Sequence, residues 1–531
     1  MIASLALPAQ PTPKPRVVIT ADPELDDNNT IIRAILYSSD VRLEGLVYAG
    51  SQFHWRGDGR GTTQYIAGRE YTRLGLCPCT SWRFAPDEHF IDNIVDAYAK
   101  AYPNLKAHDP DYPSPAELKS KIKWGNVDFD GDFSRETDGS NLIKSLLLDD
   151  DPGPLYVTAQ GGESTIARTL KSVHDQYVKT PQWEAIRTKV SRKLIIIPSG
   201  DQDGIGAAYI HPNWPDVREY IFSGVNYGYV AQAQLAPDVK AYFTPDWTRQ
   251  NVRSRGPLGD LYRVWGDGKQ MVKGDRTDYF GLSGYTGDQL KQMGYMVWMP
   301  PQPKSAFLGE GDTPTFINLV DNGLRAYQNP QWGGWGGRMQ PGVPNLSLFG
   351  PPPPNMSSDT SGVARGLAPA GSDANKVSTK PVKALDLSNF HFPAVPPRTA
   401  AISARLLVAA QNDFAARLKW SVTPKFSDAN HPPLVKIKGP LSISAAPGTT
   451  VHLQAEVSDP DHNSVSVTWW QYNDAGTYPG DVSLSDTTAL STTFRIPDDT
   501  KSGQTIHIIL EATDNGTPSL TRYQRIVVTV R

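Results

Sequence analysis

Four carboxylate residues, Asp22, Glu24, Asp26 and Asp27, stand within six positions near the start of the chain. They follow an apolar run at residues 16–20 that reads as a buried strand, and a helical pattern begins directly after them. Four such charges repel one another unless a cation or bound protons offset them. Oxygen ligands on a flexible loop would suit Ca²⁺, with Mg²⁺ the less favoured ion. The local residues fit a second interpretation equally well, in which Asp26 or Asp27 caps the helix and the other carboxylates face solvent.

Three further candidates follow later apolar runs. His54 and Trp55 come after a predicted strand at residues 43–48, where the two rings could form a platform for a sugar. A Trp in such a loop packs against the protein interior about as often. Asp203 follows a predicted strand at residues 194–198 and could bind hydroxyl groups, although an ordinary turn explains it equally well.

The segments that would position these residues alternate between short apolar runs and helical patterns, from about residue 16 to 328. The predicted strands lie at residues 16–20, 43–48, 155–158 and 194–198, and predicted helices lie at residues 28–37 and 165–178. This alternation predicts an α/β fold with a mostly parallel sheet flanked by helices. Ligands in such sheets bind beyond the carboxyl ends of the strands, where the candidates above are found.

The rest of the chain is predicted to form two further units. Residues 331–430 read as a connector rich in Pro and Gly, with a helix at residues 400–420 that packs on the first domain. Residues 431–531 show short alternating strands separated by turn residues, typical of an all-β immunoglobulin-like sandwich of the cadherin or PKD type. The α/β domain is therefore placed at residues 16–330, after a leader at residues 1–15.

Composition argues against several classes of protein. The 531 residues are 39% hydrophobic and 20% charged, as in soluble globular proteins, and they are too many for one hydrophobic core. A net charge of −3 argues against nucleic-acid binding. No apolar run approaches the roughly 20 residues needed to span a bilayer. The first ten residues fit either the end of a trimmed signal peptide or a disordered leader.

Two smaller patterns are predicted to carry no chemistry. A single Pro separates Cys77 from Cys79, so that a bridge between them would be strained, and we expect buried or partly buried thiols. Asp128, Asp130 and Asp132 alternate like the start of an EF-hand loop but lack its Gly and its distal Glu. We expect them to form a solvated surface loop.

The Asp-rich segment resembles the N-terminal motif of nucleoside hydrolases, Asp-x-Asp-Pro-x-x-Asp-Asp after the first strand. The resemblance implies that Asp22 ligates calcium and acts as general base on the bound water. It implies that Asp27 is the principal calcium ligand and that Asp26 binds a sugar hydroxyl. Thr20 stands where the family has its first Asp, which removes one supporting carboxylate.

Later landmarks occur in the chain order of the family, over roughly residues 16–330. Ser51 stands where a sugar-binding Asn is usual. Ser164 matches the residue whose main-chain carbonyl completes the calcium shell, and Asp312 matches a late Asp that ligates the metal and contacts the sugar. More narrowly, the chain resembles nucleoside-hydrolase-like proteins described as cellulose-binding. Their typical layout includes an Asn-Asp-Phe-Ala-Ala-Arg segment, here residues 412–417, and an Ig-like C-terminal domain.

Two departures from the family make nucleosides doubtful substrates. Gly311 occupies the position of a His that assists the leaving base, and Ser51 replaces a ribose ligand. An alkoxide leaving group would need a proton donor of its own, and a carboxyl group in an apolar wall would suit that role. Glu163, Asp203 and Glu310 are the candidates.

The leading functional interpretation is a calcium-dependent hydrolase that cleaves a glycosidic bond in a carbohydrate by attack of an activated water. Asn213 would contact that substrate, as an Asn in this region does in the related hydrolases. The alternative is a non-catalytic cellulose- or polysaccharide-binding protein on the same scaffold, and a true nucleoside N-ribohydrolase is the third interpretation. The resemblance implies a secreted or periplasmic protein whose partner is a plant-type polysaccharide. It also implies a homo-oligomer, although the appended sandwich could cover that surface.

Overall fold

The computed structural model describes residues 14–223, 227–229, 235–271, 279–297, 299–343, 367–368 and 397–531. The predicted leader up to residue 13, and residues 344–366 and 369–396 of the predicted connector, lie outside the described residues. None of the helices within the described ranges is long and apolar enough to cross a membrane.

A seven-stranded sheet forms the centre of the first domain, in the order β4-β2-β1-β5-β6-β7-β8. Its strands are β1 (Arg16–Ala21), β2 (Arg42–Tyr48), β4 (Ile122–Trp124), β5 (Leu155–Ala159), β6 (Leu194–Pro198), β7 (Arg218–Ser223) and β8 (Arg338–Pro341). Neighbouring strands are parallel except β8, which runs antiparallel to β7. The predicted α/β fold with a mostly parallel sheet is therefore confirmed, and the sheet takes in a strand beyond residue 330.

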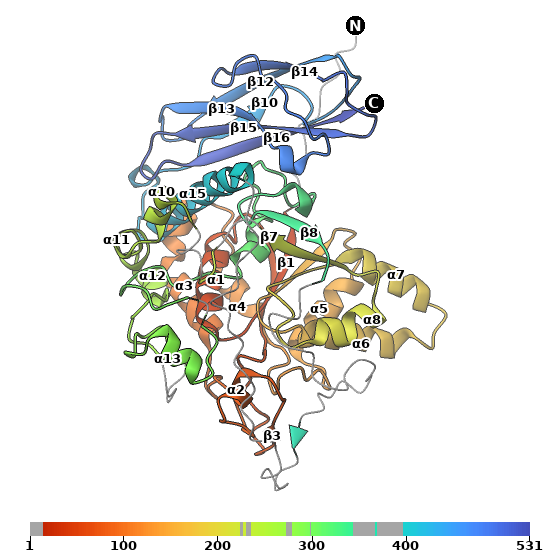
Figure 1. Ribbon diagram of the computed structural model, residues 1–531, viewed down its shortest axis with the longest axis vertical. Coiled ribbons are helices and arrows are strands. Elements are labelled where there is room, and N and C mark those ends of the chain that lie inside the picture. Colours follow the sequence, from red (N-terminus) through yellow and green to blue (C-terminus); the bar gives the residue numbers. More distant parts are fainter. Residues whose placement is uncertain are drawn as a thin grey trace.

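Helices cover both faces of this sheet because its central strands are apolar on both sides. In β1, Val17 and Ile19 belong to one hydrophobic cluster, whereas Val18 belongs to another, as the two-residue period of a strand requires. The first cluster includes residues of α1 (Leu25–Leu36) and α3 (Phe90–His108). The second includes residues of α5 (Asp138–Leu148), α6 (Ser164–Tyr177) and α7 (Trp183–Lys193). Figure 1 shows these two groups of helices on opposite sides of the sheet.

Shorter elements lie between these strands and helices. They are β3 (Thr63–Gln64), which pairs with β9 (Leu367–Ala368), together with α2 (Glu70–Arg73), α4 (Pro115–Ser120), α8 (His211–Asn213), α10 (Pro237–Lys240), α11 (Pro245–Thr248), α12 (Gly256–Leu261), α13 (Gly287–Gln292) and α14 (Thr313–Ile317). Of these, α8 and α14 bear on the functional site described below.

The C-terminal residues form two packed β-sheets, so the predicted immunoglobulin-like sandwich is confirmed. One sheet has the order β10-β12-β14 and the other β11-β16-β15-β13. The strands are β10 (Leu434–Ile437), β11 (Ser442–Ala445), β12 (Thr450–Ser458), β13 (Val465–Gln471), β14 (Ser491–Arg495), β15 (Thr505–Asp514) and β16 (Thr521–Val530). Alternate residues of these strands, such as Leu453, Trp469 and Ile508, fill a separate core between the sheets.

Helix α15 (Pro397–Trp420) lies between the two domains (Figure 1). On its first-domain side, Gln411 accepts a hydrogen bond of 2.6 Å from Arg33 of α1, and Arg417 donates to the carbonyl of Leu36. On its other side, Asp413 accepts a hydrogen bond of 2.7 Å from Arg522 of β16. The helix therefore ties the sandwich to the end of α1.

One face of the sandwich also continues the hydrophobic core of the α/β domain. Tyr472, Ile509 and Tyr523 are almost fully buried and belong to the same cluster as the residues of α1 and α3. Figure 1 shows the sandwich seated on one end of the α/β domain. This sheet face is therefore occupied by the protein itself and is not free to bind a polysaccharide.

Two local predictions are wrong. Cys77 and Cys79 form a disulfide, with Cα atoms 4.3 Å apart, near the short end of the range that a bridge can span. Asp130 is not on a solvated loop, because it is fully buried and lies 2.9 Å from both the guanidinium of Arg69 and the hydroxyl of Tyr71. Its charge is neutralised by a residue that sequence spacing does not connect to it.

Candidate functional site

The Asp-rich loop joins the end of β1 to the start of α1 and folds back on itself. Asp22 directly follows β1, and its backbone N–H donates a hydrogen bond of 3.1 Å to Asp27 Oδ1. Helix α1 begins at Leu25, and its N-cap, Glu24, forms no side-chain capping bond. Asp26 and Asp27 therefore stand in the first turn rather than at the cap, and both are buried, as is Asp22. The helix-cap interpretation of this loop does not describe the fold.

Asp312 comes to this loop from the far end of the domain. It precedes α14, and the backbone N–H of its neighbour Gly311 donates a hydrogen bond of 3.1 Å to Asp26 Oδ2. The side chains of Asp312 and Asp27 are within hydrogen-bonding reach of each other. The other oxygen of Asp26 accepts a bond of 2.7 Å from the hydroxyl of Tyr229. The structure thus brings the early Asp-rich loop and the late Asp together.

Burial and mutual repulsion raise the pKa of Asp26, Asp27 and Asp312. Burial raises the pKa of Asp27 well above its usual value, and the neighbouring charges of Asp312 and Asp22 raise it further. Burial likewise raises the pKa of Asp312, with Asp26 adding to the effect. The pKa of Asp26 rises to about 6, chiefly through burial. Two buried oxygens, Asp22 Oδ2 and Asp27 Oδ2, accept no hydrogen bond from any described residue. A cation would satisfy them and lower all of these pKa values.

The loop after β5 closes one side of the cluster. A Cβ atom added at Gly161 would lie 3.0 Å from Asp22 Oδ2, so that only a residue without a side chain lets the backbone approach this closely. Ser164 is the first residue of α6, and both its N–H and its hydroxyl donate to Asp203 Oδ2, at 3.0 and 2.5 Å. Asp203, fully buried, therefore fixes the start of this helix beside the cluster.

The turn after β2 closes a second side. Ser51 donates its N–H to the carbonyl of His54, and its hydroxyl accepts from the N–H of Phe53 at 2.9 Å. This turn places His54 Nδ1 3.3 Å from Asp22 Oδ1, with both side chains fully buried. Trp55, in contrast, is buried against Tyr71 and Phe129 and cannot stack on a ligand. Of the predicted sugar platform, His54 alone faces the carboxylates.

Two other predicted residues are engaged elsewhere. Glu310 is fully buried and forms an ion pair with Arg33, and Thr313 and Tyr262 also donate to it. This network holds the loop that carries Asp312 and leaves Glu310 no free oxygen for catalysis. Asn213 is exposed at the end of α8, and its amide donates to the carbonyl of Tyr209.

Glu163, the N-cap residue of α6, is fully buried, and neither of its oxygens has a hydrogen-bond partner among the described residues. Burial raises the pKa of Glu163 well above its usual value, and Glu219, Asp201 and Asp203 raise it further. The pKa of Asp201 rises to about 7 for the same reasons. Burial and the neighbouring carboxylates therefore favour the protonated form of Glu163.

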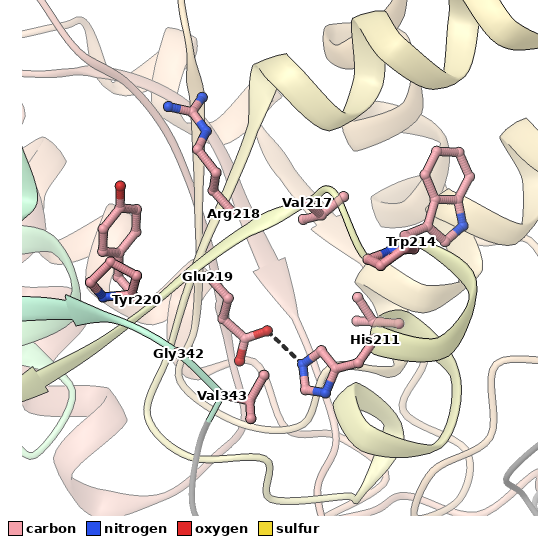
Figure 2. Close-up of a pocket in the computed structure, with 11 residues that line it drawn as sticks. His211, Trp214, Val217, Arg218, Glu219, Tyr220, Gly342 and Val343 are labelled. Atoms are coloured by element: carbon pink, nitrogen blue, oxygen red, sulfur yellow. Dashed lines mark hydrogen bonds and ion pairs between the residues drawn. The ribbon is translucent and has the colours of Figure 1, made fainter.

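An open pocket of about 360 Å³ lies at the edge of the sheet between β7, β8 and α8. Figure 2 shows its floor, where His211 Nε2 lies 2.8 Å from Glu219 Oε2, with Trp214 and Val217 along the wall. None of the residues that line it belongs to the Asp22 cluster. Buried oxygens without a hydrogen-bond partner among the described residues occur in both places: Glu219 Oε1 is in the pocket lining, whereas Asp22 Oδ2 and Asp27 Oδ2 lie in the cluster.

Several residues that complete the cluster were not predicted from the sequence. Tyr229 and the network of Arg33 with Glu310 and Gln411 have no sequence motif that signals them, because their partners lie more than 200 residues away in the chain. Glu24 is the one carboxylate of the loop that is only partly buried. It therefore lies at the edge of the cluster nearest to solvent.

Two family models match the chain. One, described as "Cellulose-binding Sde182, nucleoside hydrolase-like domain", matches residues 16–339. The other, described as "Cellulose-binding protein Sde0182, C-terminal domain", matches residues 450–530. Among curated proteins there is no match.

Among solved structures, a nucleoside hydrolase-related hypothetical protein from Saccharophagus degradans, associated with carbohydrate metabolism, is 24% identical with a TM-score of 0.63. The match covers 98% of this chain and 100% of that one, so the two share both domains of the fold. Three N-terminal domains of the bacteriophage RB49 outer capsid protein Hoc match at 14% identity over 18% of this chain and 30% of theirs, with a TM-score of 0.13. That second likeness is too small to support an argument.

Proposed function

Because the chain belongs to the cellulose-binding Sde182 family with its nucleoside hydrolase-like domain, we propose that it is a calcium-dependent hydrolase of carbohydrate glycosidic bonds. The observation that carries this proposal is the pair of buried, unpaired oxygens, Asp22 Oδ2 and Asp27 Oδ2, beside Asp312. Unpaired anionic oxygens in a protein interior are costly unless a cation neutralises them. The donor set is all oxygen, which suits Ca²⁺.

Asp22, Asp27 and Asp312 would hold the ion, and the resemblance adds the main-chain carbonyl of Ser164. When bound, Ca²⁺ would lower the pKa of a coordinated water and fix its position. Asp22, at the end of β1, would accept the proton of the attacking water. Asp26 would orient the sugar through a hydroxyl, since the bonds from Tyr229 and Gly311 hold its carboxylate in place.

We assign the acid role to Glu163. Of the three predicted donors, Glu310 is paired with Arg33, and Asp203 accepts from Ser164. Of the three, Glu163 alone has two oxygens without a hydrogen-bond partner among the described residues, and burial raises the pKa of its carboxyl group. A Glu163→Gln variant should lose far more activity on an alkyl glycoside than on a 4-nitrophenyl glycoside, because nitrophenolate leaves without a proton. Equal losses on both substrates would remove this assignment.

The test of the whole proposal measures calcium and turnover in the same variants. Asp22→Ala and Asp27→Asn should lose bound calcium, measured by elemental analysis after dialysis, and lose release of sugar from a panel of 4-nitrophenyl glycosides and oligosaccharides. Asp216→Asn, whose side chain is 72% exposed, serves as the matched control and should keep both. Turnover that persists in a calcium-free variant would contradict the mechanism.

A second candidate function is polysaccharide binding without catalysis. Both family descriptions use the words cellulose-binding, and the family's assisting His is absent at Gly311. A Cβ atom at Gly311 would lie 2.7 Å from Asp26 Oδ2, so a side chain there would have to displace the Asp26 carboxylate. Pull-down on insoluble cellulose, with soluble sugars assayed in the same tube, separates the two functions. Binding without sugar release across a broad glycan panel would favour this candidate.

We also propose that the protein works outside the cytoplasm. The Cys77–Cys79 disulfide requires an oxidising compartment, and a polysaccharide partner of plant type would be met there. Fractionation of the native host, with the protein detected by antibody, tests this location. Finding the protein in the cytoplasm with reduced thiols would contradict it.

A further inference from the structure

His54 is buried beside the carboxylate of Asp22 without forming a hydrogen bond to it. Its side chain is 0% exposed, and neither ring nitrogen has a hydrogen-bond partner among the described residues. A buried imidazole that forms no hydrogen bond loses its hydration without compensation. Buried polar groups are rarely left in this state, and an ion that the side chain ligates is one of the standard explanations.

The surroundings of His54 supply the other ligands. The ligand atoms of His54, Asp22 and Glu24 all lie within 4.8 Å of one another. His54 Nδ1 and Asp22 Oδ1 are 3.3 Å apart, and their geometry does not form a hydrogen bond. Two ligands at the Zn–N and Zn–O distances of a tetrahedral site are separated by about 3.3–3.4 Å. The pair is thus spaced as two ligands of one ion would be.

We propose that His54, Asp22 and Glu24 bind a second divalent cation, a transition metal of the Zn²⁺ or Mn²⁺ type, next to the calcium position. An imidazole nitrogen favours such an ion over Ca²⁺, which prefers oxygen alone. Three protein ligands leave a position open for water or a sugar hydroxyl. The partly buried Glu24 provides the exposed edge of this site. The proposal rests on the proposed function in one respect, since Asp22 would serve both ions.

The experiment uses the full-length protein, stripped with EDTA and then titrated with Co²⁺ in the presence of excess CaCl₂. Wild type should bind one equivalent of Co²⁺ with visible absorption bands typical of mixed nitrogen and oxygen ligands. Loss of a residue that only hydrogen-bonds to a metal ligand weakens metal binding by roughly 10- to 100-fold. His54→Gln should weaken Co²⁺ binding by more than this, because it removes a ligand itself. Its calcium content should not change. His174→Gln is the matched control, because His174 is 40% exposed on α6, and it should bind as wild type does.

Four outcomes decide the matter. Loss of calcium in Asp27→Asn with retention of Co²⁺ supports two separate ions. Unchanged Co²⁺ affinity and spectrum in His54→Gln overturns the second site and leaves the proposed function standing. Calcium binding without any Co²⁺ binding by wild type also overturns it, whereas failure to bind either ion overturns both proposals. If circular dichroism shows that His54→Gln does not fold, Glu24→Gln, at the half-buried ligand, replaces it with the same expected loss.

Discussion

Replacing Asp27 by Asn should shift the stability of the protein in opposite directions with and without calcium. Asn has the shape of Asp and can still accept the hydrogen bond from the N–H of Asp22, so the change removes charge and little else. The ligand atoms of Glu24, Asp26 and Asp27 lie within 4.8 Å of one another. Two ionised carboxylates at that distance repel by about 3.5 kcal/mol at an effective dielectric constant of about 20.

Without calcium the variant should therefore be the more stable protein. The carboxylates relieve part of the repulsion by binding protons, which reduces the expected gain to about 1–3 kcal/mol at pH 7. With calcium the order reverses. Calcium binding raises the unfolding free energy of wild type by about 2.7 kcal/mol when the calcium concentration is 100 times the Kd, and by about 1.4 kcal/mol for each further tenfold increase in that concentration. The variant, which lacks a principal ligand, should gain almost nothing.

Urea unfolding, followed by the fluorescence of the 13 Trp residues, measures both effects in EDTA and in a series of calcium concentrations. Asp216→Asn, at an exposed position, should stay within about 0.5 kcal/mol of wild type in every buffer. Equal destabilisation of the variant in EDTA and in calcium would contradict this prediction. Asp27 would then be a structural hydrogen-bond acceptor and no cation ligand.

Three further predictions follow from single contacts. Gly161→Ala places a methyl group about 3.0 Å from Asp22 Oδ2 and should weaken calcium binding by roughly tenfold. Titration calorimetry would detect this change, and an unchanged calcium affinity would show that Asp22 Oδ2 is not a ligand. Asp413→Asn leaves Arg417 and Arg522 without their shared carboxylate and should cost about 3–5 kcal/mol of unfolding free energy, whereas Asp498→Asn, in an exposed pair, should cost little; equal costs would contradict the buried network. Burial would raise the pKa of Asp413, but the nearby guanidinium groups outweigh it and lower that pKa to about 2. The ionised carboxylate therefore contributes about 2 kcal/mol to the unfolding free energy above pH 4, and this contribution is lost as pH falls toward 2. An acid titration in which wild type and Asp413→Asn lose stability in parallel would contradict this.

The elements of the α/β domain could be predicted from the sequence because local pattern decides them. The run Leu194–Ile197 has no polar residue and is bounded by a charged helix end and a turn, so it forms a fully buried strand in the predicted place. The helix of α15 and the strands of the sandwich follow the same rule. The spacing of apolar residues within each such segment is enough to predict whether it forms a helix or a strand.

The environment of single polar residues could not be predicted in this way. Asp130 is buried because Arg69 and Tyr71 reach it, and Trp55 is buried because Phe129 and Tyr71 pack around it. Arg69 and Tyr71 belong to the start of α2, and no spacing in the sequence links them to Asp130 or Trp55. The same holds for Glu310, whose partner Arg33 is 277 residues away.

Part of the candidate site could likewise be predicted from the sequence, and part could not. Asp22, Asp26 and Asp27 are close together in the sequence, and the resemblance to nucleoside hydrolases points to Asp312. These four residues could therefore be predicted as site residues from the sequence. The position of His54 beside Asp22 depends on a turn in which Ser51 binds the carbonyl of His54. That turn has no signature in the residues themselves, so the metal-binding geometry of His54 emerges only in three dimensions.

A crystal of the full-length protein grown with CaCl₂, with anomalous diffraction recorded at a long wavelength, would show whether the Asp22 cluster binds calcium. We predict one strong anomalous peak about 2.3–2.6 Å from oxygens of Asp22, Asp27 and Asp312. A well-ordered site at millimolar calcium with no peak, in which the carboxylates are hydrogen-bonded to one another, would show that the cluster does not bind calcium.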